Sequence, residues 1–321
     1  MKTFAFAALA ALAISGTPAS AADLIGKARP MMAPPPPPAW DIAFGAAVMS
    51  DYNFRGISQS NRLPSVTAYF EPRYNINPNL QLYAGVGGYS IEFPNNAGAE
   101  IDFYGGVRPT FGKLALDFGV WYYYYPEGRL FSGLLPQNCT NLPSGPAFAL
   151  GQCNVMKSDA SFIEFYAKGA YTFTDNWAIG AAGYYNPNWL NTGADGVYAS
   201  GNIKYTATAF PNGFGWYASA EVGHYWLGTT DPFYFNTPLP DYATWNIGLG
   251  LTYKVFTLDL RYYDTDLSKG ECNALTGDHT ATFNPGNIIP VVNPSGLGSK
   301  WCGAAFVAAL KVDLTLVNNI K

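Results

Sequence analysis

Charged side chains recur at every second position along much of this chain, a spacing that places them on one face of a β-strand. Residues 114–124 alternate large apolar side chains with small, polar or aromatic ones, and Asp117 is among the latter. Asp259 and Arg261 share one face of residues 256–263 in the same way. Acids that face bases across an enclosed space create a transverse field, which selects small polar or charged solutes. The same groups can instead neutralise one another as ion pairs, so a purely structural role is the alternative.

A charged side chain that faces lipid costs about 2–4 kcal/mol at the membrane midplane for Arg or Lys, so these residues belong on the inside of a closed sheet. The predicted pore-lining residues are Glu71, Arg73, Asp102, Arg108, Asp117, Glu164, Lys168, Lys204, Glu221, Asp259, Arg261 and Lys311. Further charged residues on the same predicted face are Asp41, Lys254 and Asp313. Glu71 and Arg73 stand two apart on one strand, the spacing that neutralisation within a strand requires.

Twelve segments show this alternation and are predicted to be strands. They are 40–50, 65–74, 80–91, 99–110, 114–125, 159–173, 177–186, 196–209, 215–227, 243–253, 256–266 and 304–316. Their connections alternate between tight turns, such as 254–255, and longer loops, such as 126–158 and 267–303. Because outer-membrane barrels have short periplasmic turns and longer extracellular loops, we predict an all-β fold, a transmembrane antiparallel β-barrel of about 12 strands. An exported soluble β-sandwich or propeller is the alternative.

The composition agrees with a barrel that spans a membrane. Of the 321 residues, 12% are charged, about half of the roughly 25% that is usual in soluble proteins, and 16% are aromatic. Aromatic residues gather beside long loops, as in 121–125, and beside tight turns, as at Trp177 and Phe256, which predicts two belts at the membrane interfaces. The net charge of −4 and the lack of a Lys/Arg cluster exclude nucleic acid as a partner.

The chain divides into three predicted parts. Residues 1–21 have the pattern of a cleaved secretory signal peptide, because Lys2 precedes an apolar stretch and residues 19–21 form a small-residue cleavage site. Residues 22–39 end in a run of prolines and predict an extended periplasmic tether. Residues 40–321 form the predicted barrel, and the chain after the signal peptide has no apolar run of the roughly 18 residues that a transmembrane helix needs. The predicted location is the outer membrane of a Gram-negative cell.

Four cysteines in an exported chain predict disulfides rather than a metal or redox site. Cys139 and Cys153 fall in one long loop. Cys272 and Cys302 fall in another. Because closing a short loop costs the least entropy, these two local bridges are the predicted pairs. They would either staple the loops into a lid or adhesive surface, or protect exposed loops from proteolysis.

The sequence offers little for catalysis. Its histidines are His224, near a predicted strand end, and His279, in a long loop, and neither is placed to polarise a nucleophilic serine. The chain contains no phosphate-binding loop, no Gly-x-Ser-x-Gly motif and no cluster of zinc or haem ligands. We predict no enzymatic activity, no cofactor and no metal.

The loop 51–64 carries two candidate constriction residues, Arg55 and Arg62. It can fold inward and narrow the mouth of the barrel, or it can simply join two strands. Twelve strands lie between about 8, where side chains fill the interior, and about 16, where an aqueous channel is open. The strand number is therefore compatible with a narrow pore and with a plugged barrel.

Residues 50–60, Ser-Asp-Tyr-Asn-Phe-Arg-Gly-Ile-Ser-Gln-Ser, resemble the opening signature of the TorF-family porins, also known as the Gcw_chp family of proteobacterial exported proteins. Three later stretches are similar to that family too, namely 82–86, 100–106 and 122–127. The match extends over residues 40–127 and is weaker from residue 159 onward. The resemblance implies an outer-membrane β-barrel with a porin role.

Together these features predict an outer-membrane, porin-like channel for passive diffusion of small hydrophilic solutes, with lipid and such solutes as its partners. The alternative is a non-conducting structural or surface-binding outer-membrane barrel that acts through disulfide-stapled extracellular loops. The two hypotheses differ in one observable, the conduction of ions across a bilayer.

Overall fold

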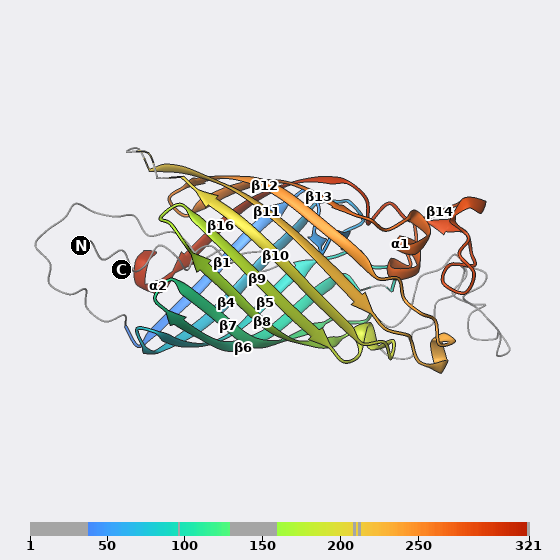
Figure 1. The fold of residues 1–321 in the computed structure, drawn as a ribbon, viewed down its shortest axis with the longest axis horizontal. Coiled ribbons are helices and arrows are strands. Elements are labelled where there is room, and N and C mark those ends of the chain that lie inside the picture. The colour runs from blue at the N-terminus through green and yellow to red at the C-terminus, as the bar shows by residue number, and fades with distance from the viewer. Residues whose placement is uncertain (1–37, 96, 129–158, 208–209, 211–212, 320–321) are drawn as a thin grey trace, which may run out of the picture.

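Backbone hydrogen bonds join the strands of this protein into a closed antiparallel barrel (Figure 1). The computed structural model describes residues 38–95, 97–128, 159–207, 210 and 213–319. Within these ranges twelve strands close the barrel in the order β1, β16, β13, β12, β11, β10, β9, β8, β7, β6, β5 and β4. Their bounds are β1 Trp40–Met49, β4 Ser65–Asn77, β5 Leu80–Ser90, β6 Ala99–Phe111, β7 Leu114–Tyr124, β8 Phe162–Thr172, β9 Trp177–Asn186, β10 Gly196–Thr206, β11 Phe214–Leu227, β12 Tyr242–Tyr253, β13 Phe256–Thr265 and β16 Ala305–Thr315.

All twelve predicted strands are present, so the prediction of an antiparallel β-barrel is confirmed. Their ends differ from the predicted ones by at most three residues. The largest difference at the start of a strand is at β8, which begins at Phe162. There the Ser161 N–H donates a hydrogen bond of 2.9 Å to the Asp159 side chain, and this local turn delays the strand.

Each strand turns one face outward and one face inward. On β7, Phe118 and Tyr122 are exposed on the outer face, whereas Asp117, Trp121 and Tyr123 are buried on the inner face. Exposed large apolar side chains cover the outer face of the other strands as well. A closed sheet pairs every strand, and an apolar exterior suits hydrocarbon, so the fold is a transmembrane barrel.

The two ends of the barrel differ. At one end, which we name the turn end, β1 begins, β16 ends and the connections are short (Figure 1). At the other, which we name the loop end, the connections are longer, and four of them contain small elements of their own within the described residues. These elements are β2 Asn53–Phe54, β3 Ile57–Ser58, α1 Lys269–Thr276, β14 Thr282–Phe283, β15 Leu297–Gly298 and the 3-10 turns Trp189–Asn191, Pro232–Tyr234 and Pro285–Asn287. A short helix, α2 Leu316–Asn319, follows β16 at the turn end.

Most of the chain before β1 lies outside the described residues. This applies to the predicted signal peptide and to all of the predicted tether except Pro38 and Ala39. The carbonyl oxygens of these two residues accept hydrogen bonds from Asn75, each of 2.8 Å, so the end of the tether lies along β4. In the described part of the chain, no helix has the length and hydropathy to cross a bilayer.

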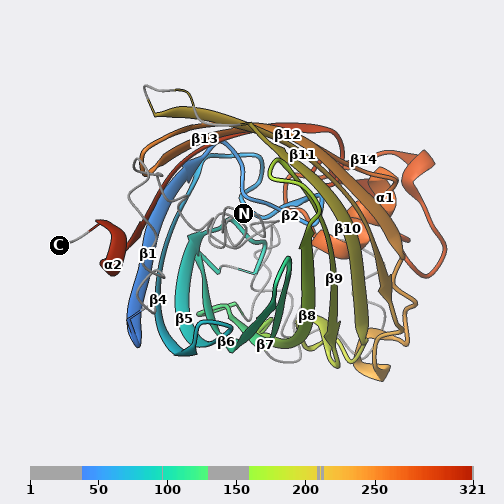
Figure 2. The same ribbon diagram turned by 60° about the vertical axis from the view of Figure 1, so that its left-hand side comes forward.

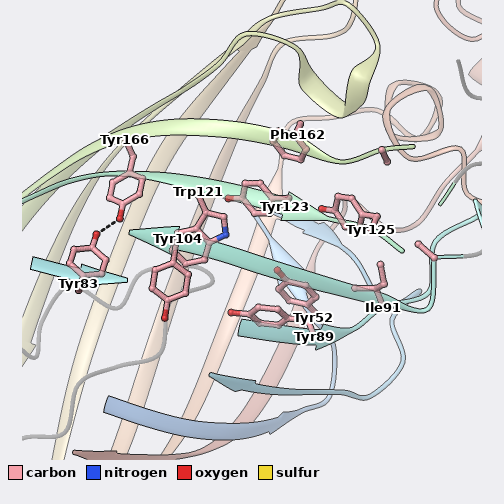
Figure 3. Packing of buried hydrophobic residues seen from close by; sticks show 12 residues of the cluster. Tyr52, Tyr83, Tyr89, Ile91, Tyr104, Trp121, Tyr123, Tyr125, Phe162 and Tyr166 are labelled. Carbon is pink, nitrogen blue, oxygen red and sulfur yellow. Dashed lines mark hydrogen bonds between the residues drawn. The ribbon is translucent and has the colours of Figure 1, made fainter. Parts of the chain in front are cut away.

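Aromatic side chains pack inside the barrel (Figure 3). The larger cluster takes its rings mainly from β5, β6, β7 and β8, and its aromatic members are Tyr52, Tyr83, Tyr89, Tyr104, Trp121, Tyr123, Tyr125, Phe162 and Tyr166. Tyr104 and Trp121 stack with ring centroids 4.2 Å apart. A second cluster joins Tyr198, Tyr225 and Tyr242 to residues of the long loops. The hydrophobic core of this protein therefore lies in its lumen.

Candidate functional site in the barrel lumen

The hairpin of β2 and β3 lies inside the ring of strands (Figure 2). Just before it, Tyr52 donates a hydrogen bond of 2.6 Å to Glu100 on β6 and stacks on an aromatic ring of β5. On the other side, a Cβ atom added at Gly56 would overlap side-chain atoms of Thr244 on β12 and Thr265 on β13. The hairpin therefore spans the lumen from β5 and β6 to β12 and β13.

The tip of the hairpin is a two-residue turn, Arg55 and Gly56, with φ values of 49° and 85°. Positive φ at both positions is typical of two-residue hairpins, because the twist of such a turn matches that of the strands. Glycine adopts this conformation freely, whereas it is uncommon for arginine. Asn53 Oδ1 stabilises the turn by accepting a hydrogen bond of 3.0 Å from the Gly56 N–H. The turn thus places an arginine side chain inside the lumen.

Arg55 forms a buried ion pair with Glu164 on β8. Its Nη1 and Nη2 atoms lie 2.8 and 2.9 Å from Glu164 Oε1 and Oε2, and the two side chains are 2% and 0% exposed. Burial alone would lower the pKa of Arg55, but the Glu164 carboxylate raises it and the net shift is upward. Glu164 also accepts hydrogen bonds from Tyr123 at 3.0 Å and Asn186 at 3.2 Å. These bonds offset the cost of burying two charges.

Aromatic rings surround the Arg55 guanidinium. Its Cζ atom lies 4.6 Å from the ring centroid of Phe54, its neighbour in the hairpin. On the barrel wall the corresponding distances are 4.6 Å to Tyr184, 4.4 Å to Tyr198 and 5.0 Å to Tyr225. Cations within about 6 Å of a ring face are attracted by it, most strongly where water is excluded. Six wall residues on β7 to β11 contact Arg55 or orient Glu164. We call this set the guanidinium cage; its members are Tyr123, Glu164, Tyr184, Asn186, Tyr198 and Tyr225.

Arg62 fastens the hairpin loop to the loop between β13 and β16 rather than lining the lumen. Its guanidinium donates hydrogen bonds to three backbone carbonyl oxygens within residues 300–303. It also pairs with Asp51, with Nη1 and Oδ2 2.9 Å apart. Of the two predicted constriction residues, the structure therefore brings only Arg55 into the lumen.

The predicted Cys272–Cys302 disulfide is confirmed, and it supports the same contact. It links α1 to the segment before β16, with Cα atoms 5.7 Å apart. The adjacent Trp301 is buried, donates a hydrogen bond of 2.9 Å to Asn61, and accepts one of 2.9 Å from the Ser58 N–H. The disulfide thus holds the segment that clamps the hairpin. The predicted Cys139–Cys153 bridge lies outside the described residues.

Nearer the turn end, β4, β6 and β7 carry a network of ion pairs. Arg108 lies 2.8 and 3.1 Å from the two Glu71 carboxylate oxygens and 3.3 Å from Asp117. Arg73 donates a hydrogen bond of 2.6 Å to Glu71. The Arg108 Cζ atom also lies 3.5 Å from the ring centroid of Tyr83. Four of the predicted pore-lining residues therefore meet on this wall.

A second network lies on β11, β12 and β13. Arg261 pairs with Asp259 at 3.0 Å and donates hydrogen bonds to Asn246 at 2.6 Å and Ser219 at 3.0 Å. Tyr217 donates a hydrogen bond to Asp259. In the order of strands around the barrel, this network is opposite the one on β4, β6 and β7. The two charged walls therefore face each other across the lumen.

The predicted lysines also lie on the inner face. Lys168 is buried, with Nζ 4.3 Å from the ring centroid of Tyr166. Lys204 Nζ lies 4.2 Å from the ring centroid of Tyr217. Lys311 shares the inner face of β16 with buried neighbours on either side. The lysine stems thus pack on the wall beside aromatic and small residues.

The two remaining predicted acids, Asp102 and Glu221, are buried on the inner face. In the described part of the chain, Asp102 Oδ1 and Glu221 Oε2 have no hydrogen-bond partner. Asp313 accepts a hydrogen bond of 3.0 Å from Tyr69, and Asp41 accepts one of 3.1 Å from the backbone of α2. The prediction that Lys254 faces the lumen is wrong. This residue is exposed in the β12–β13 turn, where the strand alternation ends.

The prediction of a loop-end aromatic belt is only half right. Tyr122 and Tyr124 do face outward, whereas Trp121, Tyr123 and Tyr125 point inward and are buried in the lumen. The period of two already contained this signal, because sequence neighbours on a strand point to opposite faces. The period of two did not predict the role of the inner rings, which pack against the hairpin.

Neither histidine lies in the lumen networks. His224 is next to Trp226, with ring centroids 4.5 Å apart, on the face of β11 opposite the buried Tyr225. His279 Nε2 lies 3.4 Å from Glu92. Among the residues that the structure describes, no three His, Cys, Asp or Glu side chains are arranged to hold a metal ion.

A family model described as "Bacterial protein of unknown function (Gcw_chp)" matches residues 35–285. The chain belongs to the Gcw_chp family. The predicted membership of the Gcw_chp family is thus confirmed. Because the family description assigns no function, the TorF-family porin role and the proteobacterial origin implied by the resemblance stay predictions. No curated protein matches this Gcw_chp sequence.

Solved outer-membrane proteins are similar to this Gcw_chp protein at low sequence identity. An outer membrane channel from Pseudomonas putida F1 has a TM-score of 0.43 at 11% identity, covering 87% of this chain and 96% of that chain. A KdgM porin has a TM-score of 0.39 at 8% identity, covering 85% and 98%. In-vitro folded OmpT of Vibrio cholerae has a TM-score of 0.37 at 13% identity, covering 86% and 98%. At these TM-scores no functional property is transferred from them.

Proposed function

We propose that this Gcw_chp protein is an outer-membrane channel for passive diffusion of small hydrophilic solutes, narrowed by the β2–β3 hairpin. The observation that carries the proposal is the solvent exposure of the charged inner walls. The side chains of Arg108 and Arg261 are 20% and 14% exposed, although both face the lumen. Charged groups in an interior filled with side chains would be dry, as Arg55 and Glu164 are at the hairpin.

The charge arrangement gives such a channel its selectivity. The network of Glu71, Arg108 and Asp117 faces the network of Asp259 and Arg261 across the lumen. Facing charges favour solutes that can exchange water for polar contacts and disfavour apolar ones. Both networks are mixed in sign, so the channel would pass small solutes of either sign with modest preference.

We further propose that the barrel lies in the outer membrane of a Gram-negative cell after removal of residues 1–21. The apolar outer face and the predicted signal peptide support this location. The turn end would face the periplasm and the loop end the exterior, as in barrels with short periplasmic turns. The partners would be outer-membrane lipid and small hydrophilic solutes, with no enzymatic activity or cofactor.

A second candidate function rests on the way in which the β2–β3 hairpin is held inside the barrel. The Arg55–Glu164 pair is dry, and the segment beside the Cys272–Cys302 disulfide clamps the hairpin from the loop end. A barrel that stays closed in this way would be a non-conducting structural or surface-binding protein, acting through its stapled loops.

Planar-bilayer conductance separates the two candidates. The refolded mature protein is compared with a variant in which residues 52–60 are replaced by a short Gly-Ser linker, and heat-modifiable gel migration verifies that both barrels are closed. We expect discrete, salt-dependent current steps that are larger in the linker variant. Lys113→Ala, a change in an exposed turn, is the control and should match the unmodified protein. Closed barrels that give no steps in either protein would overturn the channel and favour the second candidate.

A further inference from the structure

The cage residues belong to the barrel wall, whereas Arg55 and its neighbour Phe54 are supplied by a loop. Glu164 lies on β8, Tyr123 lies on β7, and the other three cage tyrosines lie on β9, β10 and β11. Strands β8 to β11 are paired continuously in register. The backbone positions of the cage residues are therefore set by the pairing of the wall strands.

Contacts within the wall also orient the cage side chains. Asn186 donates hydrogen bonds to Glu164 at 3.2 Å and to the Tyr225 hydroxyl at 2.6 Å. The Tyr198 ring lies directly over Gly223, where an added Cβ atom would overlap it. Wall residues thus hold the Glu164 carboxylate and the rings of Tyr198 and Tyr225 in position. This preorganisation lowers the entropy cost of binding a ligand in the cage.

The wall around the cage carries more carboxyl groups than the one with which Arg55 pairs. Four acids are buried on the inner face of the loop-end half: Glu100, Asp102, Glu164 and Glu221. Arg55 pairs with Glu164, while Asp102 Oδ1 and Glu221 Oε2 lack hydrogen-bond partners among the described residues. Glu221 adjoins the cage, because it accepts a hydrogen bond of 3.3 Å from Tyr198. The cage therefore has a second carboxyl group at its edge, and Lys168 Nζ lies 5.4 Å from the ring centroid of Tyr184.

We propose that the guanidinium cage is a binding site for small guanidinium-bearing solutes, and that Arg55 is its tethered occupant. A planar guanidinium can donate two parallel hydrogen bonds to a carboxylate while its faces lie against aromatic rings, as Arg55 does here. An ammonium is a compact point charge and cannot make this contact. Such a solute competes with Arg55 and favours withdrawal of the hairpin. The inference rests on the proposed function, since the solute must reach the cage through the barrel mouth.

The test uses the mature protein with Arg55→Ala, refolded in detergent micelles, with methylguanidinium chloride as the probe. The midpoint of thermal unfolding is followed by circular dichroism, and methylammonium chloride at equal ionic strength is the matched control. We expect a saturable rise of about 2–4 °C with methylguanidinium only, because a ligand that binds the folded state stabilises it by mass action. The double variant Arg55→Ala/Glu164→Gln should show no rise. The unmodified protein should respond less, because its tethered arginine has a high effective concentration.

Equal responses to the two probes, or an equal response of the double variant, would overturn the proposal. If Arg55→Ala does not refold, Arg55→Lys replaces it, and its rise with methylguanidinium must exceed that of the unmodified protein. Because the assay needs no conduction, a protein that binds the probe but gives no current steps contradicts the channel alone. A conducting protein whose Arg55→Ala variant shows no rise contradicts the cage alone.

Discussion

Arg55 and Glu164 form a two-point ion pair between the tip of a loop hairpin and the barrel wall, although 109 positions separate them in the sequence. The pair is dry, whereas the charged walls nearer the turn end keep some solvent exposure. In the proposed channel, this contact decides whether the lumen is closed at the hairpin.

Arg55→Ala should both destabilise the barrel and increase conductance. It leaves the Glu164 carboxylate buried without its cation, and breaking a buried pair in this way costs about 3–5 kcal/mol. The free energy of unfolding from urea titration in micelles and single-channel currents measure the two effects. Adding Glu164→Gln should restore part of the stability, because the two residues are coupled. Unchanged stability and conductance in Arg55→Ala would show that the pair does not hold the hairpin.

Gly56→Ala should displace the hairpin without touching any charge. The new Cβ atom would overlap Thr244 and Thr265, and φ at this position is 85°. Gly112→Ala is the matched control, because its φ is also positive, at 60°, but an added Cβ atom meets no atom within 4 Å. Both variants should lose about 1–2 kcal/mol from backbone strain, and only Gly56→Ala should also give larger current steps. Similar currents in the two variants would contradict this.

Removal of the Cys272–Cys302 disulfide should loosen the clamp on the hairpin. We expect the double Cys→Ser variant to lose about 2–4 kcal/mol of stability and to open more often in single-channel records. The reason is that Trp301, beside Cys302, contacts the hairpin loop through Ser58 and Asn61. A double Cys→Ser variant at positions 139 and 153 serves as the control. Equal open probability in the two double variants would show that the clamp does not depend on this disulfide.

Neutralising acids on the facing walls should change ion selectivity. In the background with the Gly-Ser linker, Asp117→Asn combined with Asp259→Asn leaves Arg108 and Arg261 without these partners. The lumen becomes more positive, so the reversal potential under a salt gradient should shift toward anion preference. Asp175→Asn in an exposed turn is the control and should leave the reversal potential unchanged. If the wall variant behaves like this control, the charged walls are structural ion pairs only.

Local pattern was sufficient for the barrel and for the inward direction of its charges. Membrane strands have one strong constraint, since lipid on the outside makes every second residue apolar, and that period is visible without any long-range contact. The register of Asp117 or Arg261 on its strand could therefore be predicted. The predicted inward direction of Lys254 is wrong because the strand period ends at a turn, where alternation assigns a side chain to neither face.

The occupancy of the lumen depended on contacts between distant parts of the chain. Loops have no period, so nothing in residues 51–64 distinguishes Arg55, which enters the lumen, from Arg62, which binds the opposite loop. That difference follows from the turn at Arg55 and Gly56 and from an acid on β8 that barrel closure brings to the same depth. The same holds for the inner aromatic residues. Strand alternation predicts that Trp121 and Tyr123 lie on the inner face, but only closure of the sheet brings them against the residues on which they pack. Pairing of charges and rings across a lumen is a property of three-dimensional distance, which a one-dimensional period does not contain.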